Sequence, residues 1–284
     1  MKLFKNSISI LLSLLLFTFL SLPVVPVFAA ASTENSITLN EYELVKQLAG
    51  ESISSLQEKN FDSAEISDIK NYKNVFNEHI SNLNTLSDNA LIANGYSKSQ
   101  INIIRNFHGT DAELRRLGAT LTLSARTNNF KFDGNYTTGK LTYSWKWNSI
   151  PAFKMKDMIA ASWNNWATTN NSSNVKYYNV NTGAYYTQSA ATFSTDSNGT
   201  SGAGHKFNVS KSDNYYYAKS GSGSFTVRSD THAKKDFFYY IAYGHSQLSP
   251  SINFSVGIGG ADASISFSAG TVISDSKNGS ALIP

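Results

Sequence analysis

The chain has 284 residues, with 24 lysines and arginines against 20 aspartates and glutamates, and no cysteine. A disulfide framework and a thiol nucleophile are therefore excluded, and stability must come from burial and backbone pairing. Glutamate stops at Glu113, whereas all four tryptophans and 12 of the 15 tyrosines follow it. This asymmetry divides the chain into a charge-rich front and an aromatic back.

Residues 1–31 have the pattern of a secretory signal peptide. Lys2 and Lys5 precede an apolar run at Ile8–Leu20, and small residues suited to cleavage end at Ala31. The alternative is an uncleaved membrane anchor, but this run of 13 residues is shorter than the roughly 20 that span a bilayer. We expect a secreted, extracellular protein, and the lack of cysteine in an exported chain suggests a Gram-positive bacterium.

The two regions that follow carry opposite net charge. Residues 32–118 hold 12 acidic and 8 basic side chains, whereas residues 119–284 hold 8 acidic and 14 basic ones. A basic surface can bind an anionic partner such as a bacterial membrane or cell wall, although it can equally be a solvated surface without a partner. No cluster of lysine and arginine exceeds two residues, so nucleic acid is not expected as a partner.

Residues 32–118 are predicted to form a helical N-terminal region. Apolar residues recur at steps of three and four within Leu44–Leu56 and Ile66–Leu83, which is the period of an amphipathic helix. Shorter helices are expected after Ser87 and Ser97, which can cap them. Gly95 is placed to end the first of these, because glycine accepts the left-handed conformation.

From residue 119 the apolar period changes to two, so residues 119–284 are predicted to form a β-rich domain. Strands are expected at Thr120–Ser124, Leu141–Trp147, Val175–Val180, Lys206–Lys211, Asn214–Lys219, Ser224–Ser229, Phe237–Tyr243, Ser251–Ile258 and Ala263–Ile273. Turns are expected at Gly221–Gly223 and other glycine-containing segments, and Lys156–Trp166 fits either a helix or a strand. The predicted class is α+β, with an antiparallel β-sandwich or an elongated β-sheet after the helices.

The segment Ser251–Ile273 predicts a hairpin with one apolar face and one face of small polar residues. The apolar face includes Ile252, Phe254, Val256, Ile258, Ile265 and Phe267. A transmembrane β-hairpin needs such faces, although the clean alternation covers eight residues per strand, slightly short of the about 9–11 that span. One hairpin cannot close a barrel, so insertion would require several chains to associate. The other interpretation is a hairpin with its apolar face on the core.

The aromatic residues of the back half allow two interpretations. In the first interpretation, aromatic side chains form a surface platform for sugar rings or anchor the protein at a membrane interface. The candidates for this role are Trp145, Trp147, Trp163 and Trp166. Core packing combined with ordinary strand propensity explains the same residues.

No catalytic or metal-binding signature is present. The five histidines lack the short paired spacing of a zinc site, and Gly244–Leu248 lacks the second glycine of a nucleophile elbow. Glycoside cleavage normally uses two carboxylates, and the back half offers eight aspartates and no glutamate. We expect no cofactor, and a hydrolase would need an unfamiliar site.

Several short motifs together resemble secreted Gram-positive proteins of unassigned activity and the large unmodified bacteriocins of the geobacillin type. They are Asn94–Ser97 with Gln100-Ile101, Gly109-Thr110, Ala119–Thr122, Tyr143–Trp147, Ala160–Trp163 and Tyr243–His245. The resemblance covers roughly residues 86–270 and supplies no site residues. It implies an antibacterial role.

These observations lead to three functional hypotheses. The first is a secreted, bacteriocin-like protein that acts on a target cell envelope without catalysis, through the amphipathic hairpin. The second is a module that binds wall polysaccharide through exposed aromatic residues. The third is a hydrolase with an unrecognised site.

Overall fold

The computed structural model describes residues 35–282, except 59–60, 155, 164–165, 195–201, 212–214, 230–235, 248–251, 257–262 and 268–278. Every described residue lies in the compact unit Ser32–Pro284. Ile258 therefore lies outside the described residues. The side chains of the other five hairpin candidates do too, although the backbone of their strands is described.

Seven helices follow a short first strand, β1 (Asn35–Asn40). They are α1 (Glu41–Ala49), α2 (Ile53–Glu58), α3 (Ser63–Lys70), α4 (Tyr72–Asn84), α5 (Asp88–Ala93), α6 (Lys98–Arg105) and α7 (Asp111–Leu117). Strand β1 was not predicted, although Ile37 and Leu39 alternate with polar residues and pack against the core of the sheets. The alternation of apolar and polar residues in β1 is short and is followed at once by the helical pattern of α1, which begins at Glu41, so the strand was hard to recognise.

Local side-chain chemistry explains where the helices begin and end. Ser87 and Ser97 cap α5 and α6 as predicted, and Gln100 completes a capping box with Ser97. Gly95 follows the end of α5 with φ +100°, in the left-handed region that glycine tolerates. Asp62 caps α3, and Glu65 completes a capping box with it.

The rest of the described chain is almost entirely antiparallel β-structure, so the α+β class is confirmed. A seven-stranded sheet has the order β1-β2-β3-β10-β5-β6, with β9 also paired to β10, and a five-stranded sheet has the order β14-β11-β4-β8-β7. The bounds are β2 (Thr120–Phe132), β3 (Thr137–Trp147), β4 (Lys156–Trp163), β5 (Trp166–Asn179), β6 (Tyr185–Ser189), β7 (Ala191–Ser194), β8 (Gly202–Asn208), β9 (Ser210–Lys211), β10 (Tyr216–Ser229), β11 (Asp236–Gln247) and β14 (Gly279–Leu282).

The hairpin strands β12 (Ile252–Val256) and β13 (Ala263–Phe267) form a third, two-stranded sheet. Their register pairs Phe254 with Ile265 and Ser255 with Ser264. The predicted hairpin is therefore present at the level of backbone pairing. The ambiguous segment Lys156–Trp166 contains β4, so the strand interpretation is correct there.

The predicted turn at Gly221–Gly223 is wrong, because β10 runs through it without interruption. Gly221 pairs with Trp145 of β3, and Gly223 pairs with Tyr143. A Cβ atom on Gly221 would lie 2.6 Å from Trp145 Nε1, and one on Gly223 would lie 2.3 Å from Tyr143 Oη. The two glycines therefore leave space for aromatic rings to cover the strand.

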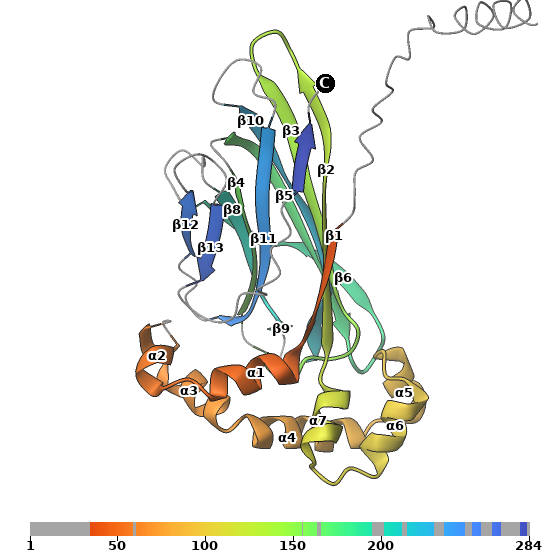
Figure 1. The fold of residues 1–284 in the computed structure, drawn as a ribbon. Coiled ribbons are helices and arrows are strands. Elements are labelled where there is room, and N and C mark those ends of the chain that lie inside the picture. The colour runs from red at the N-terminus through yellow and green to blue at the C-terminus, as the bar shows by residue number, and fades with distance from the viewer. Residues whose placement is uncertain are drawn as a thin grey trace, which may run out of the picture. The chain divides into compact units, whose positions relative to one another are not determined.

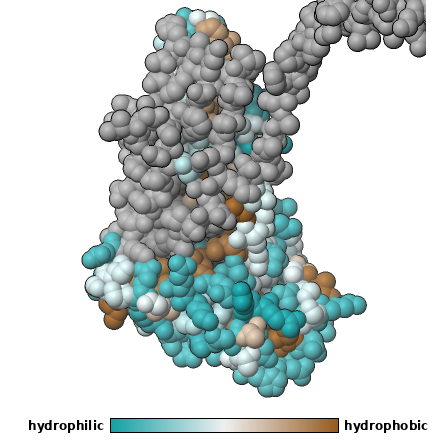
Figure 2. Space-filling model, in the orientation of Figure 1, coloured by the Kyte–Doolittle hydropathy of each residue, from teal (hydrophilic) through white to brown (hydrophobic). Residues whose placement is uncertain are grey.

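The two larger sheets share one hydrophobic cluster that contains all four tryptophans. Trp145 stacks on Phe207 of β8 with ring centroids 4.8 Å apart, and Trp166 meets Phe237 of β11 edge to face. A second cluster joins the helices to the loop after β3 and to the ends of β5 and β10. The helices accordingly cover one end of the sheets (Figure 1). Their face seen in Figure 2 is mainly hydrophilic, with separated hydrophobic spots.

Substitution of Gly95, which contacts the loop after β3, tests how closely the helices pack on the sheets. A Cβ atom on Gly95 would lie 1.9 Å from the Asn148 carbonyl oxygen, whereas Gly134, with a similar φ of +99°, has nothing within 4 Å. We expect Gly134→Ala to cost about 1–3 kcal/mol from backbone strain alone, and Gly95→Ala to cost clearly more because the loop must move. Urea unfolding measures both, and equal losses would show that the approach to Asn148 is unimportant.

Candidate functional site

Two places in the described structure gather polar chemistry: a sealed charged cluster and an open groove. The sealed cluster joins three distant parts of the chain through His245 of β11. Its Nδ1 lies 2.8 Å from Asp157 Oδ1 of β4, and its Nε2 lies 3.1 Å from Glu41 Oε1 of α1. Glu41, Asp157 and His245 are all 0% exposed.

Further hydrogen bonds satisfy the two carboxylates of this cluster. The backbone N–H groups of Ala152 and Phe153 donate to Glu41 at 2.9 and 2.8 Å. The Tyr243 hydroxyl donates to Asp157 at 2.5 Å and accepts a bond from Trp147 Nε1 at 3.2 Å. A buried charge cluster is stable only with such complete hydrogen bonding.

The cluster holds His245 as a cation. Burial alone would lower the pKa of His245, but the charge of Asp157 and hydrogen bonds to Asp157 and Glu41 raise it to about 10. Both ring nitrogens of the imidazolium face carboxylate oxygens, so the ring has no free lone pair with which to act as a base. The three side chains are fully buried and do not line the surface hollows that are described below. We therefore interpret the cluster as a structural link between helices and sheets rather than a catalytic site.

A second buried histidine is held neutral between the sheets. His205 Nδ1 of β8 lies 2.6 Å from the Tyr143 hydroxyl, and its ring stacks on Phe225 of β10 with centroids 4.9 Å apart. Burial lowers the pKa of His205 to about 4. His205 therefore contributes packing and two hydrogen bonds, the second between its Nε2 and Asn171 Oδ1 at 3.4 Å. No cluster of metal-ligating side chains is found in the part of the chain that the structure describes.

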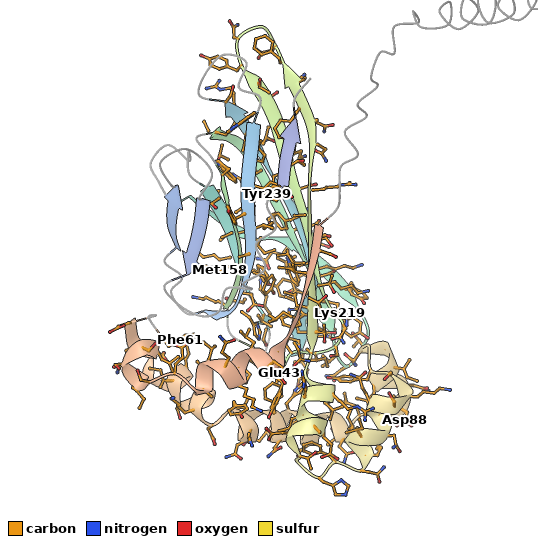
Figure 3. All side chains as sticks on the ribbon, in the orientation of Figure 1. Glu43, Phe61, Asp88, Met158, Lys219 and Tyr239 are labelled. Atoms are coloured by element: carbon orange, nitrogen blue, oxygen red, sulfur yellow. The ribbon has the colours of Figure 1, made fainter. Side chains whose placement is uncertain are left out.

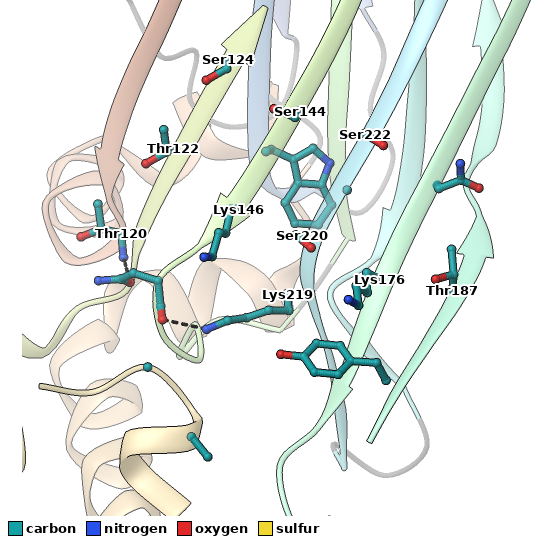
Figure 4. A pocket seen from close by; sticks show the side chains of 17 residues that line it. Thr120, Thr122, Ser124, Ser144, Lys146, Lys176, Thr187, Lys219, Ser220 and Ser222 are labelled. Carbon is teal, nitrogen blue, oxygen red and sulfur yellow. Dashed lines mark hydrogen bonds between the residues drawn. The ribbon is translucent and has the colours of Figure 1, made fainter. Parts of the chain in front are cut away.

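The open groove lies on the outer face of the seven-stranded sheet, beside the end of α5, and has a volume of about 1230 Å³ (Figure 4). Strand alternation creates it: Tyr143, Trp145 and Trp147 of β3 point into the core, so Ser144 and Lys146 point outward. The lining is Ala93, Gly95, Thr120, Thr122, Ser124, Ser144, Trp145, Lys146, Asn148, Asn174, Lys176, Tyr185, Thr187, Lys219, Ser220, Gly221 and Ser222.

Lysines are the only charged residues among the described residues of this lining. Lys146 and Lys176 are exposed on β3 and β5, and Lys176 Nζ lies 4.3 Å from the centre of the Tyr185 ring. A second hollow of about 470 Å³ shares Ser124, Ser144, Asn174 and Ser222 with the groove and adds Arg126 and Lys140. In the part of the chain that the structure describes, neither lining contains an acidic residue, so the combined surface attracts anions.

Lys219 lines the groove and lies where the sheet meets the helices (Figure 3). Its ammonium group donates to the carbonyl oxygens of Asn148 at 2.7 Å and Asn94 at 3.2 Å. Burial, and then the charge of Lys146, lower the pKa of Lys219 to about 8. Asn94 is the residue at which α5 ends, and a cation is favourable at a helix C-terminus. Lys219 is therefore a second link to the helices.

Of the sequence-predicted tryptophans, Trp145 contributes to the lining of this groove, and Trp147, Trp163 and Trp166 do not. Trp147, Trp163 and Trp166 are 0% exposed and Trp145 is 3% exposed, so the four tryptophans belong to the core and form no exposed aromatic surface. The structure brings them together because they face inward on neighbouring strands of the two sheets. Sequence reasoning missed the groove, whose signal was the polar half of the same alternation: Thr122, Ser124, Ser144, Lys146, Ser220 and Ser222.

Comparisons with known proteins give no assignment. No family model matches the chain, and no curated protein matches it. Solved structures that resemble it include "BspA_C_mut", with 8% identity over 44% of this chain and 50% of that one, at a TM-score of 0.26. The chain thus spans half the length of that structure.

Two further structures are similar at the same level. One is from "pH-induced modulation of Streptococcus parasanguinis adhesion by Fap1 fimbriae", with 12% identity over 58% of this chain and 79% of that one, at a TM-score of 0.25. The other is from "AvmM Catalyzes Macrocyclization in Alchivemycin A Biosynthesis", with 10% identity over 56% and 86%, at a TM-score of 0.26. At these TM-scores the likeness carries no functional argument.

The pH dependence of stability tests the role of His245. The unfolded-chain pKa of histidine is about 6.5, below the value of about 10 in the folded protein. The stabilisation is therefore complete below about pH 6.5 and is lost as the pH rises toward 10, by a few kcal/mol. We expect His245→Gln to be less stable at pH 6.5 and to lack this alkaline loss.

Urea unfolding of both proteins between pH 6 and 10 gives the comparison. Lys219 has the opposite sign, since its lowered pKa adds stability as the pH rises above about 8. It is present in both proteins, so the difference between the two curves isolates His245. Parallel curves would contradict the assignment.

Proposed function

We propose that this chain is a secreted protein that acts without catalysis on the envelope of a target bacterium, in the manner of a bacteriocin. Its recognition surface is the hydroxyl- and lysine-lined groove on the seven-stranded sheet. The observation that carries the proposal is the composition of this groove: serine, threonine and asparagine side chains with lysines and no acid. The sheets serve as a sandwich-like scaffold that holds the groove rigid.

The groove suits a polymer of sugars or polyols. Hydroxyl and amide side chains both donate and accept hydrogen bonds, which matches a ligand rich in hydroxyl groups. The side chains stand on paired strands rather than on loops, so little conformational entropy is lost when they bind. The aromatic surface expected for a sugar-binding module is replaced here by a polar one, because the tryptophans are in the core.

Blocking the groove tests this function. Ser222 of β10 is exposed between Ser144 of β3 and Asn174 of β5. We expect Ser222→Trp to reduce sedimentation of the protein with purified Gram-positive cell walls at least tenfold, because the indole fills the groove. Asn208→Trp, at an exposed position of β8, is the matched control and should bind normally. Equal binding by both variants would contradict the assignment to the groove.

The hairpin β12–β13 supports a second candidate function, insertion into the target membrane. Within the described residues these strands pair only with each other. The Cα atoms of β13 come within 8 Å of Cα atoms in β4 and β11, closer than the roughly 10 Å between packed sheets. One row across these strands consists of Ala242, Ala160 and Gly204, whose small side chains would permit such an approach.

Small residues on the sheet would also lower the contribution of the sheet surface to the cost of detaching the hairpin. The free energy lost is proportional to the apolar area uncovered, and alanine and glycine contribute little area. Among the described residues no helix is long and apolar enough to cross a bilayer. In this candidate function, the crossing element is the hairpin, and several chains associate on the membrane to complete a pore.

A charge on the apolar side of the hairpin tests insertion. We expect Phe254→Lys to abolish dye release from anionic vesicles, because a lysine facing lipid costs about 2–4 kcal/mol at the bilayer centre. Ser255→Lys, on the opposite side of β12 by strand alternation, should retain release. Circular dichroism and wall binding verify that both variants fold. Release that survives Phe254→Lys, or a wild-type protein without release, would remove this candidate.

A further inference from the structure

The strand register arranges the outward side chains of the groove in rows across the sheet. Lys146 of β3 pairs with Thr122 of β2 and Ser220 of β10, and Ser220 pairs with Lys176 of β5, which pairs with Thr187 of β6. The next row is Ser124, Ser144, Ser222, Asn174 and Ser189. Charged and neutral rows therefore occupy different levels along the strands.

Positive charge gathers at two stations. The first station is Lys146 and Lys176, which flank Ser220 in one row. Lys219, the residue before Ser220 on β10, lines the same groove. The second station is Arg126 and Lys140, which line the adjoining hollow. Lys140 and Lys146 are six residues apart on β3, which corresponds to about 20 Å along the strand. Between the stations the outward residues are hydroxyls and amides.

This spacing selects among the ligands that the proposed function allows. A neutral glycan gains nothing from cations at both ends of its site. A bilayer is flat, whereas the stations line hollows of about 1230 and 470 Å³. Single-stranded nucleic acid is bound through successive aromatic stacking platforms. Among the described lining residues of the groove, Tyr185 is the one exposed aromatic residue, so the groove does not fit single-stranded nucleic acid. The remaining fit is an extended chain with anionic groups separated by hydroxyl-bearing units.

We propose that the groove binds a phosphodiester-linked polyol polymer of the Gram-positive cell wall, whose phosphates lie at the two stations and whose hydroxyls lie on the neutral rows between them. This inference rests on the proposed function and specifies its ligand. Both stations must be occupied at once for full affinity, because a second contact made by the same chain benefits from a high effective concentration. Affinity therefore depends on polymer length as well as on charge.

Charge variants and polymer length together test the proposal. We expect Lys146→Ala/Lys176→Ala and Arg126→Ala/Lys140→Ala each to weaken binding of purified poly(glycerol phosphate) at least tenfold at low ionic strength. Lys98→Ala/Lys206→Ala removes the same charge from exposed positions on α6 and β8 and should change affinity less than twofold. An oligomer too short to span about 20 Å should bind weakly and lose affinity in only one of the two double variants.

Each variant must retain the thermal unfolding of the parent protein, which is expected because the four substituted side chains point away from the core. Walls stripped of their phosphodiester polymers should no longer retain the protein. If stripped walls still retain it and the charge variants bind normally, the ligand is a neutral glycan: this inference is overturned and the proposed function stands. If untreated walls do not retain the wild-type protein, the proposed function fails as well. Binding of the short oligomer with full affinity, or of anionic lipid vesicles through the same lysines, would also overturn the inference.

Discussion

The ion cluster at Glu41, Asp157 and His245 is the interaction on which the arrangement of helices and sheets depends. Each member comes from a different element, and none can be buried without the others, since an unpaired charge in the interior costs several kcal/mol. Glu41 is also the first residue of α1, where a carboxylate is favourable at a helix N-terminus. One side chain thus begins the helical region and fixes it to the five-stranded sheet.

Lys219 has the complementary role on the other sheet. Glu41 brings an anion from the helices to the sheets, whereas Lys219 brings a cation from the sheet to the carbonyl that ends α5. Because Lys219 also lines the groove, the position of the helices affects one part of its lining. The structural link and the proposed recognition surface therefore meet in one side chain.

Much of the fold could be predicted from local pattern, and the site could not. Alternation gave the inward face of β3, and the capping serines gave the starts of α5 and α6, because these signals involve neighbours in sequence. The turn expected at Gly221–Gly223 failed because the reason for those glycines is Tyr143 and Trp145 on another strand. The polar half of the alternation marks the groove residues singly, but their arrangement depends on register between five strands. The ion cluster depends on partners 204 residues apart and leaves no local signal.

The distance between Glu41 and His245 along the chain has a consequence for biosynthesis. The anion is made early and its counter-ion late, so the interface cannot close until most of the polypeptide exists. A product truncated before His245 would leave two carboxylates in an apolar junction without a cation, and its helices would stay undocked and open to proteases. Burial of His245 thus makes docking of the helices depend on synthesis of the chain through residue 245.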